Sequence, residues 1–520
     1  MAIRAVVNTA HKVFVLPFHS AMAKIIPPIA EFDAADGRMM VMPHNYSSTR
    51  LARNMGFKVA APISSQYNWR GTVPFKSQKL TAAMLTMNKR GYVLSEMGTG
   101  KTRAALFAID YMIQSKQAHR CLIVAPLSTL TVVWDLELLL NFPHLTVKVL
   151  HGAREKRLKL LAQEADIYII NHDGMQSIRH ELREYIGIDM ILVDELGKFR
   201  NGSTDRWEAL EMILQGRPYA WGMTGSPIPK EPADAWAQAK LITPQSAKMS
   251  WSSFRKKVMF KLTQFRWVAK EDAKELVYEL LQPAIRFARK DVVELPPLTH
   301  ALREVQQSPA QVTAYKKLMT YARISYCEGE VTAANEGVLF SKLLQVSCGW
   351  VYTTEKDVID LNPKARIDAV KDIIDEASQK VIVYVSFTHS AHFVLEALER
   401  DYPGQVAYVT GEVIKTERDK VLGAFQKPGG QRILVAHPQC MSHGLNLQVA
   451  NVIVWFSLPT DLDTFEQACA RIPRPGQKHN MLIVYLVGTP IERKVYKRLQ
   501  EKASMQGAVL EMFESEREAA

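Results

Sequence analysis

Short apolar runs alternate with longer amphipathic segments over residues 76–245. Runs of four to seven mostly apolar residues bounded by polar ones predict buried strands, and the segments between them have helical period. This alternation predicts an α/β fold with a parallel sheet covered by helices on both faces. The runs are YVLS at 92–95, CLIVAP at 121–126, IYII at 167–170, MILVD at 190–194 and YAWGMTG at 219–225.

A second series of apolar runs, within residues 346–490, predicts a second α/β unit. Residues 246–345 between the two series lose the strand signal and favour a helical connector. Residues 491–520 are expected to form a C-terminal helix, and residues 1–75 a small N-terminal accessory region that is a candidate for binding DNA. A ligand is expected at the carboxyl ends of the strands, facing the cleft between the units. The second series comprises KVIVYVSF at 380–387, QVAYVT at 405–410, RILVAH at 432–437, NVIVWF at 451–456 and MLIVYLV at 481–487.

Composition narrows the class of protein without identifying it. The 520 residues include 65 Lys and Arg against 53 Asp and Glu, a net charge of +12, and 47% are hydrophobic. These values exclude a disordered chain, a collagen and a coiled-coil rod. The five cysteines form no CxxC pair, so a disulfide scaffold and a zinc module are not expected. No apolar run reaches the ~18 residues of a membrane helix, and the first residues are expected to belong to the fold. The net positive charge points to a polyanionic partner.

The strongest local feature is a glycine-containing turn between a predicted strand and a predicted helix. It reads Ser95-Glu96-Met97-Gly98-Thr99-Gly100-Lys101-Thr102. Glycines let backbone N–H groups face phosphate oxygens, and the helix N-terminus favours negative charge. Lys101 is suited to the β- and γ-phosphates and Thr102 to Mg²⁺. The strict phosphate-loop pattern fails at its first glycine, where Ser95 stands.

Two further clusters carry candidate chemistry. Asp194 ends the run MILVD and Glu195 follows it. Asp194 is a candidate ligand for phosphate-bound Mg²⁺, and Glu195 is a candidate for orienting or deprotonating water. Arg471 and Arg474 lie three residues apart. They are either an exposed basic helix end or guanidinium groups that stabilise charge on a transferred phosphoryl group.

The motifs, taken in order, resemble the superfamily 2 helicase-type ATPases, specifically the Swi/Snf-type DNA translocases. The resemblance covers about residues 70–500. It implies two RecA-like lobes, ATP with Mg²⁺, and a DNA partner, double-stranded or branched. The segments that carry it are SEMGTGKT, CLIVAPLSTLTVVWDLE, IYIINHDGM, VDELGKFRN, WGMTGSPIPKEPADAWAQAKLITP, LLQPAIRFARKDVVELPP, KVIVYVSFTHSA and HGLNLQVANVIVWFSLPTDLDTFEQACARIPRPGQ.

The same resemblance implies roles for individual residues. Gln78 falls where the family reads adenine, and the arginine pair would complete the ATP site from the second lobe. Candidate DNA-backbone contacts are small polar residues near strand ends, although each of them could equally be a turn or helix-cap residue. The implied ATP-site residues are Gln78, Met97, Gly98, Thr99, Gly100, Lys101, Thr102, Asp194, Glu195, Arg471 and Arg474, and the DNA candidates are Ser128, Thr129, Thr410 and Asn446.

Several positions depart from the family pattern. Gly197 replaces the histidine that usually ends the acid box, and Ser226 replaces a threonine. Residues 441–444, MSHG, replace a run of small residues before GLNL. His443 in this run lacks a second ligand at suitable spacing, which favours a structural role.

Three functions remain open from the sequence. The first is an ATP-driven translocase on double-stranded DNA, the second a branch-specific helicase or annealing enzyme, and the third a DNA-binding scaffold with a degenerate ATPase. The absence of reader, zinc-finger and nuclease motifs favours a bacterial or phage-type enzyme, expected in the cytoplasm and associated with the nucleoid. The basic pair Lys256 and Lys257 is a further candidate for touching DNA, although such a pair more often forms a solvated helix face.

Overall fold

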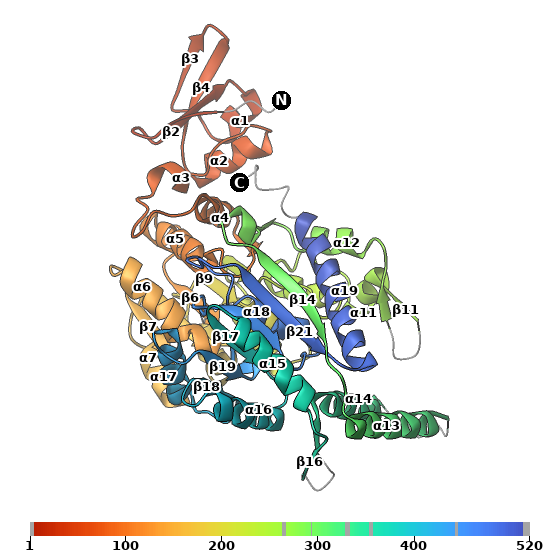
Figure 1. Cartoon of the computed structure of the whole chain (residues 1–520). Coiled ribbons are helices and arrows are strands. Elements are labelled where there is room, and N and C mark those ends of the chain that lie inside the picture. The colour runs from red at the N-terminus through yellow and green to blue at the C-terminus, as the bar shows by residue number, and fades with distance from the viewer. Residues whose placement is uncertain are drawn as a thin grey trace. The chain divides into compact units, whose positions relative to one another are not determined.

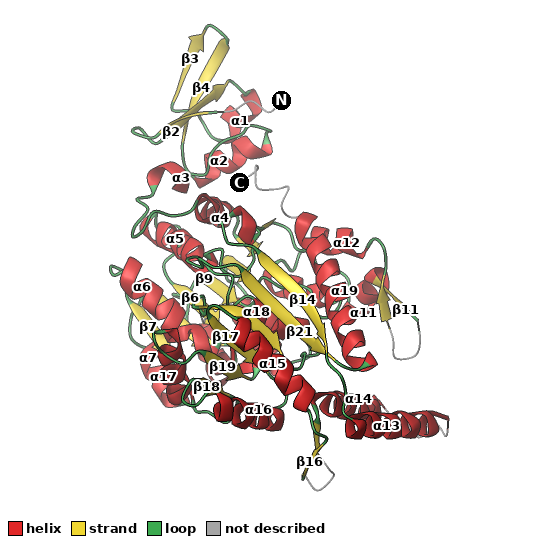
Figure 2. Cartoon of the chain, in the orientation of Figure 1, coloured by secondary structure: helices red, strands yellow, loops and turns green. Residues whose placement is uncertain are grey.

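A computed structural model describes residues 5–262, 267–292, 294–327, 333–352, 357–441 and 446–512. The chain divides into two compact units, the first built from residues up to 293 together with residues from 505 onward, and the second from residues 294–504. Each unit has its own parallel sheet (Figures 1 and 2). The predicted α/β class with two parallel-sheet lobes is therefore confirmed. None of the helices over these residues is long and apolar enough to cross a membrane.

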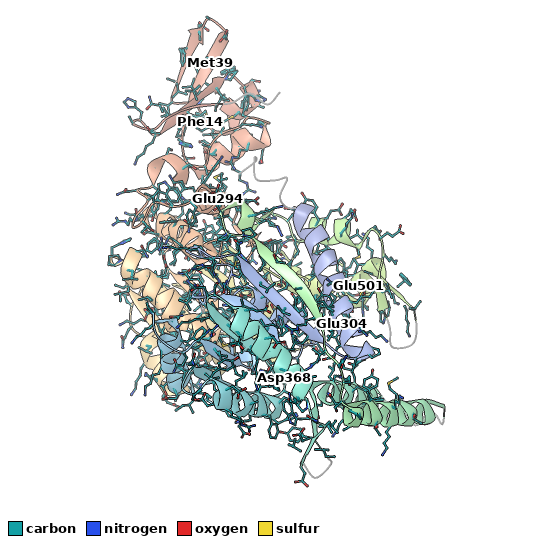
Figure 3. The ribbon with its side chains drawn as sticks, viewed as in Figure 1. Phe14, Met39, Glu294, Glu304, Asp368 and Glu501 are labelled. Atoms are coloured by element: carbon teal, nitrogen blue, oxygen red, sulfur yellow. The ribbon has the colours of Figure 1, made fainter. Side chains whose placement is uncertain are left out.

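The N-terminal part of the first unit is a small α/β subdomain with its own hydrophobic core. Its antiparallel sheet has the order β1 (Val6–Asn8), β2 (Val13–Pro17), β4 (Gly37–Pro43), β3 (Ala30–Ala34). Helices α1 (Ser20–Ile25) and α2 (Tyr46–Asn54) complete it. Alternate strand residues such as Phe14 and Met42 are fully buried, and Figure 3 labels Phe14 within this sheet. The short α3 (Ile63–Gln66) leads to the next layer.

The larger part of the first unit is a seven-stranded sheet of order β13-β5-β10-β9-β6-β8-β7, and every pairing in it is parallel. Successive residues of a strand point to opposite faces. Accordingly, Tyr92 belongs to one buried hydrophobic cluster and Val93 to another. The strands are β5 (Arg90–Val93), β6 (Cys121–Ala125), β7 (Val147–Leu150), β8 (Ile167–Asn171), β9 (Met190–Asp194), β10 (Tyr219–Met223) and β13 (Ala284–Ile285). The helices are α4 (Lys76–Met87), α5 (Lys101–Gln114), α6 (Leu136–Asn141), α7 (Arg154–Leu161), α8 (Arg179–Glu184), α9 (Asp205–Leu214), α10 (Asp234–Ile242), α11 (Trp251–Val258) and α12 (Ala273–Leu280).

The second unit has a six-stranded parallel sheet of order β14-β21-β20-β17-β19-β18. Its strands are β14 (Leu298–Glu304), β17 (Lys380–Tyr384), β18 (Val406–Val409), β19 (Ile433–Ala436), β20 (Ala450–Trp455) and β21 (Met481–Val487), and a small hairpin pairs β15 (Trp350–Tyr352) with β16 (Val358–Asp360). The helices are α13 (Pro309–Cys327), α14 (Ala333–Cys348), α15 (Lys364–Glu376), α16 (Thr388–Asp401), α17 (Lys415–Gln426), α18 (Leu462–Cys469) and α19 (Pro490–Met512), which begins in this unit.

Residues 246–345 are not purely helical, contrary to the sequence prediction. They contain the hairpin β11 (Met259–Lys261) and β12 (Trp267–Ala269) as well as helices. They also supply β13 to the sheet of the first unit and β14 to the sheet of the second. The strand signal was absent because β13 has only two residues and β14, LTHALRE, is largely exposed and polar. This segment is therefore divided between the two sheets.

Candidate nucleotide site

The register of the first sheet aligns three loops that carry the predicted chemistry. Val93 at the end of β5 pairs with Met223 at the end of β10, which pairs with Asp194 at the end of β9. The carboxyl ends of parallel strands lie at one edge of a sheet. The phosphate-loop segment, the Thr224–Ser226 turn and the acid pair therefore leave the sheet side by side, as Thr224 N donating to Val93 O at 3.0 Å confirms.

The phosphate-loop segment has the backbone form that its glycines predict. Gly98 and Gly100 have φ of 82° and 77°, a region that favours glycine. Helix α5 begins at Lys101 immediately after the loop. The Lys101 ammonium donates to the carbonyl oxygens of Ser95 at 2.6 Å and Glu96 at 3.1 Å. Lys101 thus lies across the loop, while Met97 and Thr102 remain partly exposed and Thr99 donates to Glu96 O at 2.8 Å.

Gln78 lies against the same loop. Its side-chain oxygen accepts from Phe75 N at 2.9 Å and its amide nitrogen donates to Gly100 O at 3.2 Å. A Cβ on Gly100 would lie 2.4 Å from that amide nitrogen and would displace the Gln78 side chain, and the φ of 77° also disfavours other residues there. The structure therefore brings Gln78 and the loop together.

Ser95, the departure from the strict glycine pattern, uses its hydroxyl. The oxygen accepts a hydrogen bond from Phe287 N at 3.0 Å. Next to it, the Glu96 carboxylate pairs with the buried Arg286 guanidinium at 3.2 Å and accepts from Arg289 N at 2.9 Å. Arg289 also donates to Met97 O at 3.0 Å. Arg286, Phe287 and Arg289, which follow β13, therefore contact the phosphate-loop segment. The sequence did not predict these contacts.

Two neighbouring side chains hold Asp194 of the acid pair in place. Burial raises the pKa of Asp194, while the indole N–H of Trp134 and the charge of Lys101 act in the opposite direction. The Trp134 Nε1 donates to Asp194 Oδ2 at 3.1 Å, and the buried His172 ring contacts the Asp194 carbonyl at 2.9 Å. Glu195 has φ of 52°, an unfavourable value for a side-chain-bearing residue that is typical of functional turns. The π-helical turn Leu130–Asp135 positions Trp134.

Gly197 is glycine because the neighbouring turn leaves no room for a side chain. A Cβ at this position would lie 2.7 Å from the Ser226 carbonyl oxygen and 3.3 Å from Thr224 Oγ1. The acid box and the Thr224–Ser226 turn are thus in direct backbone contact. The histidine typical of the family cannot fit in this arrangement.

The two predicted arginines lie in the second unit and differ in environment. Arg471 is only 1% exposed, and its Nε donates to Gln467 O at 2.7 Å. Arg474 is half-buried, and its Nε donates to Ala470 O at 2.9 Å. Of the two, Arg474 lies nearer the surface of its unit.

The four candidate DNA contacts are also unlike one another. Thr129 and Thr410 are buried, and the Thr129 hydroxyl donates to Pro126 O at 3.0 Å, as in an ordinary turn. The Ser128 hydroxyl has no hydrogen-bond partner among the described residues. Asn446 is exposed and contacts Gln448. Ser442–Leu445, with His443, lie outside the described residues.

Three tryptophans whose rings could suggest base stacking are core residues instead. Trp134, Trp221 and Trp455 are fully buried. Within the described part of the chain, no group of three or more His, Cys, Asp or Glu side chains is placed to hold a metal ion.

A glycine-rich phosphate loop after β5, an acid pair at the end of β9 and a helix starting at the loop lysine are typical of a nucleoside-triphosphate-hydrolysing class of protein. The SNF2-related domain model matches residues 75–347 and the helicase conserved C-terminal domain model matches residues 365–476. The chain belongs to the SNF2-related family, a class of DNA-dependent ATPases. The predicted family is confirmed.

Relatives include proteins of a phage, a bacterium and eukaryotes, and a similar solved structure comes from an archaeon. Protein p41 of Acyrthosiphon pisum secondary endosymbiont phage 1 is 25% identical over 81% of this chain and 95% of its own length. The ATP-dependent helicase YqhH of Bacillus subtilis is 25% identical over 80% of this chain and 75% of its own length. The solved SWI2/SNF2 ATPase core of Sulfolobus solfataricus in complex with double-stranded DNA is 20% identical, with a TM-score of 0.42, over 87% of this chain and 96% of that one.

Proposed function

We propose that this protein is an ATP-driven motor that moves along double-stranded DNA and remodels DNA or protein–DNA complexes. The observation that carries the proposal is the set of nucleotide-site residues at the carboxyl edge of the sheet in the first unit. Register aligns the Lys101 loop and the Asp194–Glu195 pair, and Lys101 acts electrostatically on Asp194. A scaffold with a degenerate ATPase has no reason to keep a buried carboxylate within reach of a lysine charge.

Each residue of the proposed site has a defined task. Lys101 and the backbone N–H groups of Gly98 and Gly100 bind the phosphates of ATP. Gln78 recognises adenine, and Glu195 orients the attacking water. Thr102 and Asp194 would hold Mg²⁺, which neutralises phosphate charge when bound.

In this proposal the second unit supplies arginines that offset the negative charge on the transferred phosphoryl group. Arg471 and Arg474 are proposed to stabilise the transferred phosphoryl group, with Arg474 as the surface group and Arg471 entering after a rearrangement of its buried side chain. The lobes are proposed to bind DNA phosphates through Ser128, Thr129, Thr410 and Asn446, of which the buried Thr129 and Thr410 require a local rearrangement. Such contacts depend on salt and not on sequence.

ATPase assays with and without duplex DNA test the proposal. Lys101→Ala is expected to lower DNA-stimulated turnover roughly 100-fold or more, as loss of a charge-stabilising group does. The matched control is Lys159→Ala, which removes an exposed lysine from helix α7 of the same unit and should leave turnover unchanged. Undiminished turnover in Lys101→Ala would contradict the assignment. Failure of the wild type to displace a third strand from a triplex would reject movement along DNA.

A further inference from the structure

A basic surface surrounds helix α11 and the β11–β12 hairpin of the first unit. The described residues of 248–274 include seven Lys and Arg residues but only two acidic residues, a net charge of +5. Helix α11 ends in the basic run Arg255, Lys256, Lys257, of which both lysines are exposed. The nucleotide site described above uses none of these residues.

Two tryptophans on this surface are held in place by one arginine. The Arg255 guanidinium carbon lies 5.1 Å from the Trp251 ring centroid and 4.5 Å from the Trp267 ring centroid. Glu231 binds the same guanidinium, with Nε–Oε1 and Nη2–Oε2 distances of 3.2 Å. Because Glu231 neutralises the charge of Arg255, the guanidinium acts here mainly by packing between the two indole rings. The rings are thus fixed before any ligand arrives.

Trp251 is not needed to build the core. It is 41% exposed and belongs to none of the buried clusters found in the described residues, whereas Trp267 packs against the core of the first unit. Exposed cations flank the rings. Lys261 pairs directly with Trp267 across the hairpin, so their side chains share a face, and Lys256 and Lys257 follow on the helix.

An exposed, prefixed aromatic ring among lysines fits an unpaired nucleic-acid strand. Lysines alone would be sufficient to bind the phosphates of a duplex. An exposed ring could not stack on duplex bases, because their faces are covered by their stacked neighbours. Unpaired bases offer a free π-face, and proteins that bind single strands combine such rings with a basic track. A merely solvated helix face would not require an arginine–carboxylate pair to hold its tryptophan.

We propose that Trp251, supported by Arg255 and Trp267 and flanked by Lys256, Lys257 and Lys261, binds single-stranded DNA, such as the unpaired arm of a fork. Only the choice of DNA as the polymer rests on the proposed function. The motor would then receive a second, structure-selective contact outside its ATP site. This would favour branched over plain duplex DNA as substrate.

Equilibrium binding of fluorescent oligonucleotides without nucleotide tests the site separately from the motor. Trp251→Ala should bind a single-stranded oligo(dT) about 5- to 100-fold more weakly, as loss of one stacked base predicts, while Trp251→Phe should retain most of the affinity. Binding of a blunt duplex of equal length should change less than twofold. Lys256→Gln with Lys257→Gln should reduce the slope of log affinity against log salt by about 1.4.

The control pair Lys156→Gln with Lys159→Gln removes two exposed lysines from helix α7 and should leave oligo(dT) binding unchanged. Equal loss of duplex and oligo(dT) binding in Trp251→Ala, or no loss of either, would overturn the proposal. A tenfold preference for oligo(U) over oligo(dT) would overturn the choice of DNA. If Trp251→Ala does not fold, the lysine pair carries the test. Duplex-stimulated ATPase reports on the proposed motor and should be unchanged in Trp251→Ala.

Discussion

Substituting Gly197 by alanine perturbs the contact between the acid box and the Thr224–Ser226 turn. The added Cβ would lie 2.7 Å from the Ser226 carbonyl oxygen. That atom belongs to the backbone, so no flexible side chain can move aside. Either the acid-box turn or the Thr224–Ser226 turn must shift, and both lie at the carboxyl edge of the sheet beside the nucleotide loop.

The expected loss follows from two opposing terms. Forcing a methyl group into a packed site costs about 1–3 kcal/mol. The reduced entropy of the unfolded chain returns about 0.4–1 kcal/mol when glycine becomes alanine. The free energy of unfolding should therefore fall by about 1–2 kcal/mol. ATP turnover should fall further than stability, because catalytic groups tolerate displacements of only a fraction of an ångström.

Urea unfolding and ATPase assays on Gly197→Ala measure both effects. The matched control is Gly202→Ala, five residues away, where the added Cβ would meet Trp236 at an ordinary 3.5 Å. The control should unfold at or above the wild-type midpoint with unchanged turnover. The reasoning is refuted if Gly197→Ala matches the wild type in both measurements. Gly197→His, which restores the residue typical of the family, should be more damaging than alanine.

Two further predictions concern buried charges. Arg366 and Glu492 form a 2.6 Å ion pair inside the second unit. Because Arg366→Met leaves the Glu492 carboxylate unpaired, it should lower the free energy of unfolding of that unit by about 3–5 kcal/mol, measured with urea. Adding Glu492→Gln to this variant should recover part of the loss. Burial lowers the pKa of His172 to about 4, so the folded state favours the neutral ring. Stability should then fall as pH drops below about 6.5, where the unfolded ring takes up a proton, and level off near the folded pKa. In His172→Asn, the fall in the free energy of unfolding between about pH 6.5 and 4 should be smaller by about 3 kcal/mol. An unchanged pH profile would contradict the prediction.

The strands that the sequence predicted are those with contiguous apolar residues. All five runs of 76–245 and all five of 346–490 overlap a strand of the structure. Strand β14 was missed because its exposed, polar residues resemble a loop, although it pairs with β21 along its whole length. Tertiary pairing thus overrides the local pattern at a sheet edge.

The candidate site was predictable only where its residues are adjacent in sequence. The Lys101 loop and the Asp194–Glu195 pair are contiguous motifs whose chemistry can be read directly. The supporting contacts join residues far apart: 60 positions separate Trp134 from Asp194, and 192 separate Ser95 from Phe287. A sequence pattern carries no signal for such pairs, because either partner alone is an ordinary tryptophan or serine.

The departures from the family pattern argue against a degenerate ATPase. A site that has lost its function is expected to show empty contacts and orphaned polar groups, since nothing maintains them. The Ser95 hydroxyl instead accepts a backbone hydrogen bond at 3.0 Å, and Gly197 is the residue that allows the acid box to contact the Ser226 carbonyl. Two of the departures, Ser95 and Gly197, are thus each matched by a specific contact with a neighbouring residue. They leave Lys101, Asp194 and Glu195 in place, which is the pattern expected of a working site.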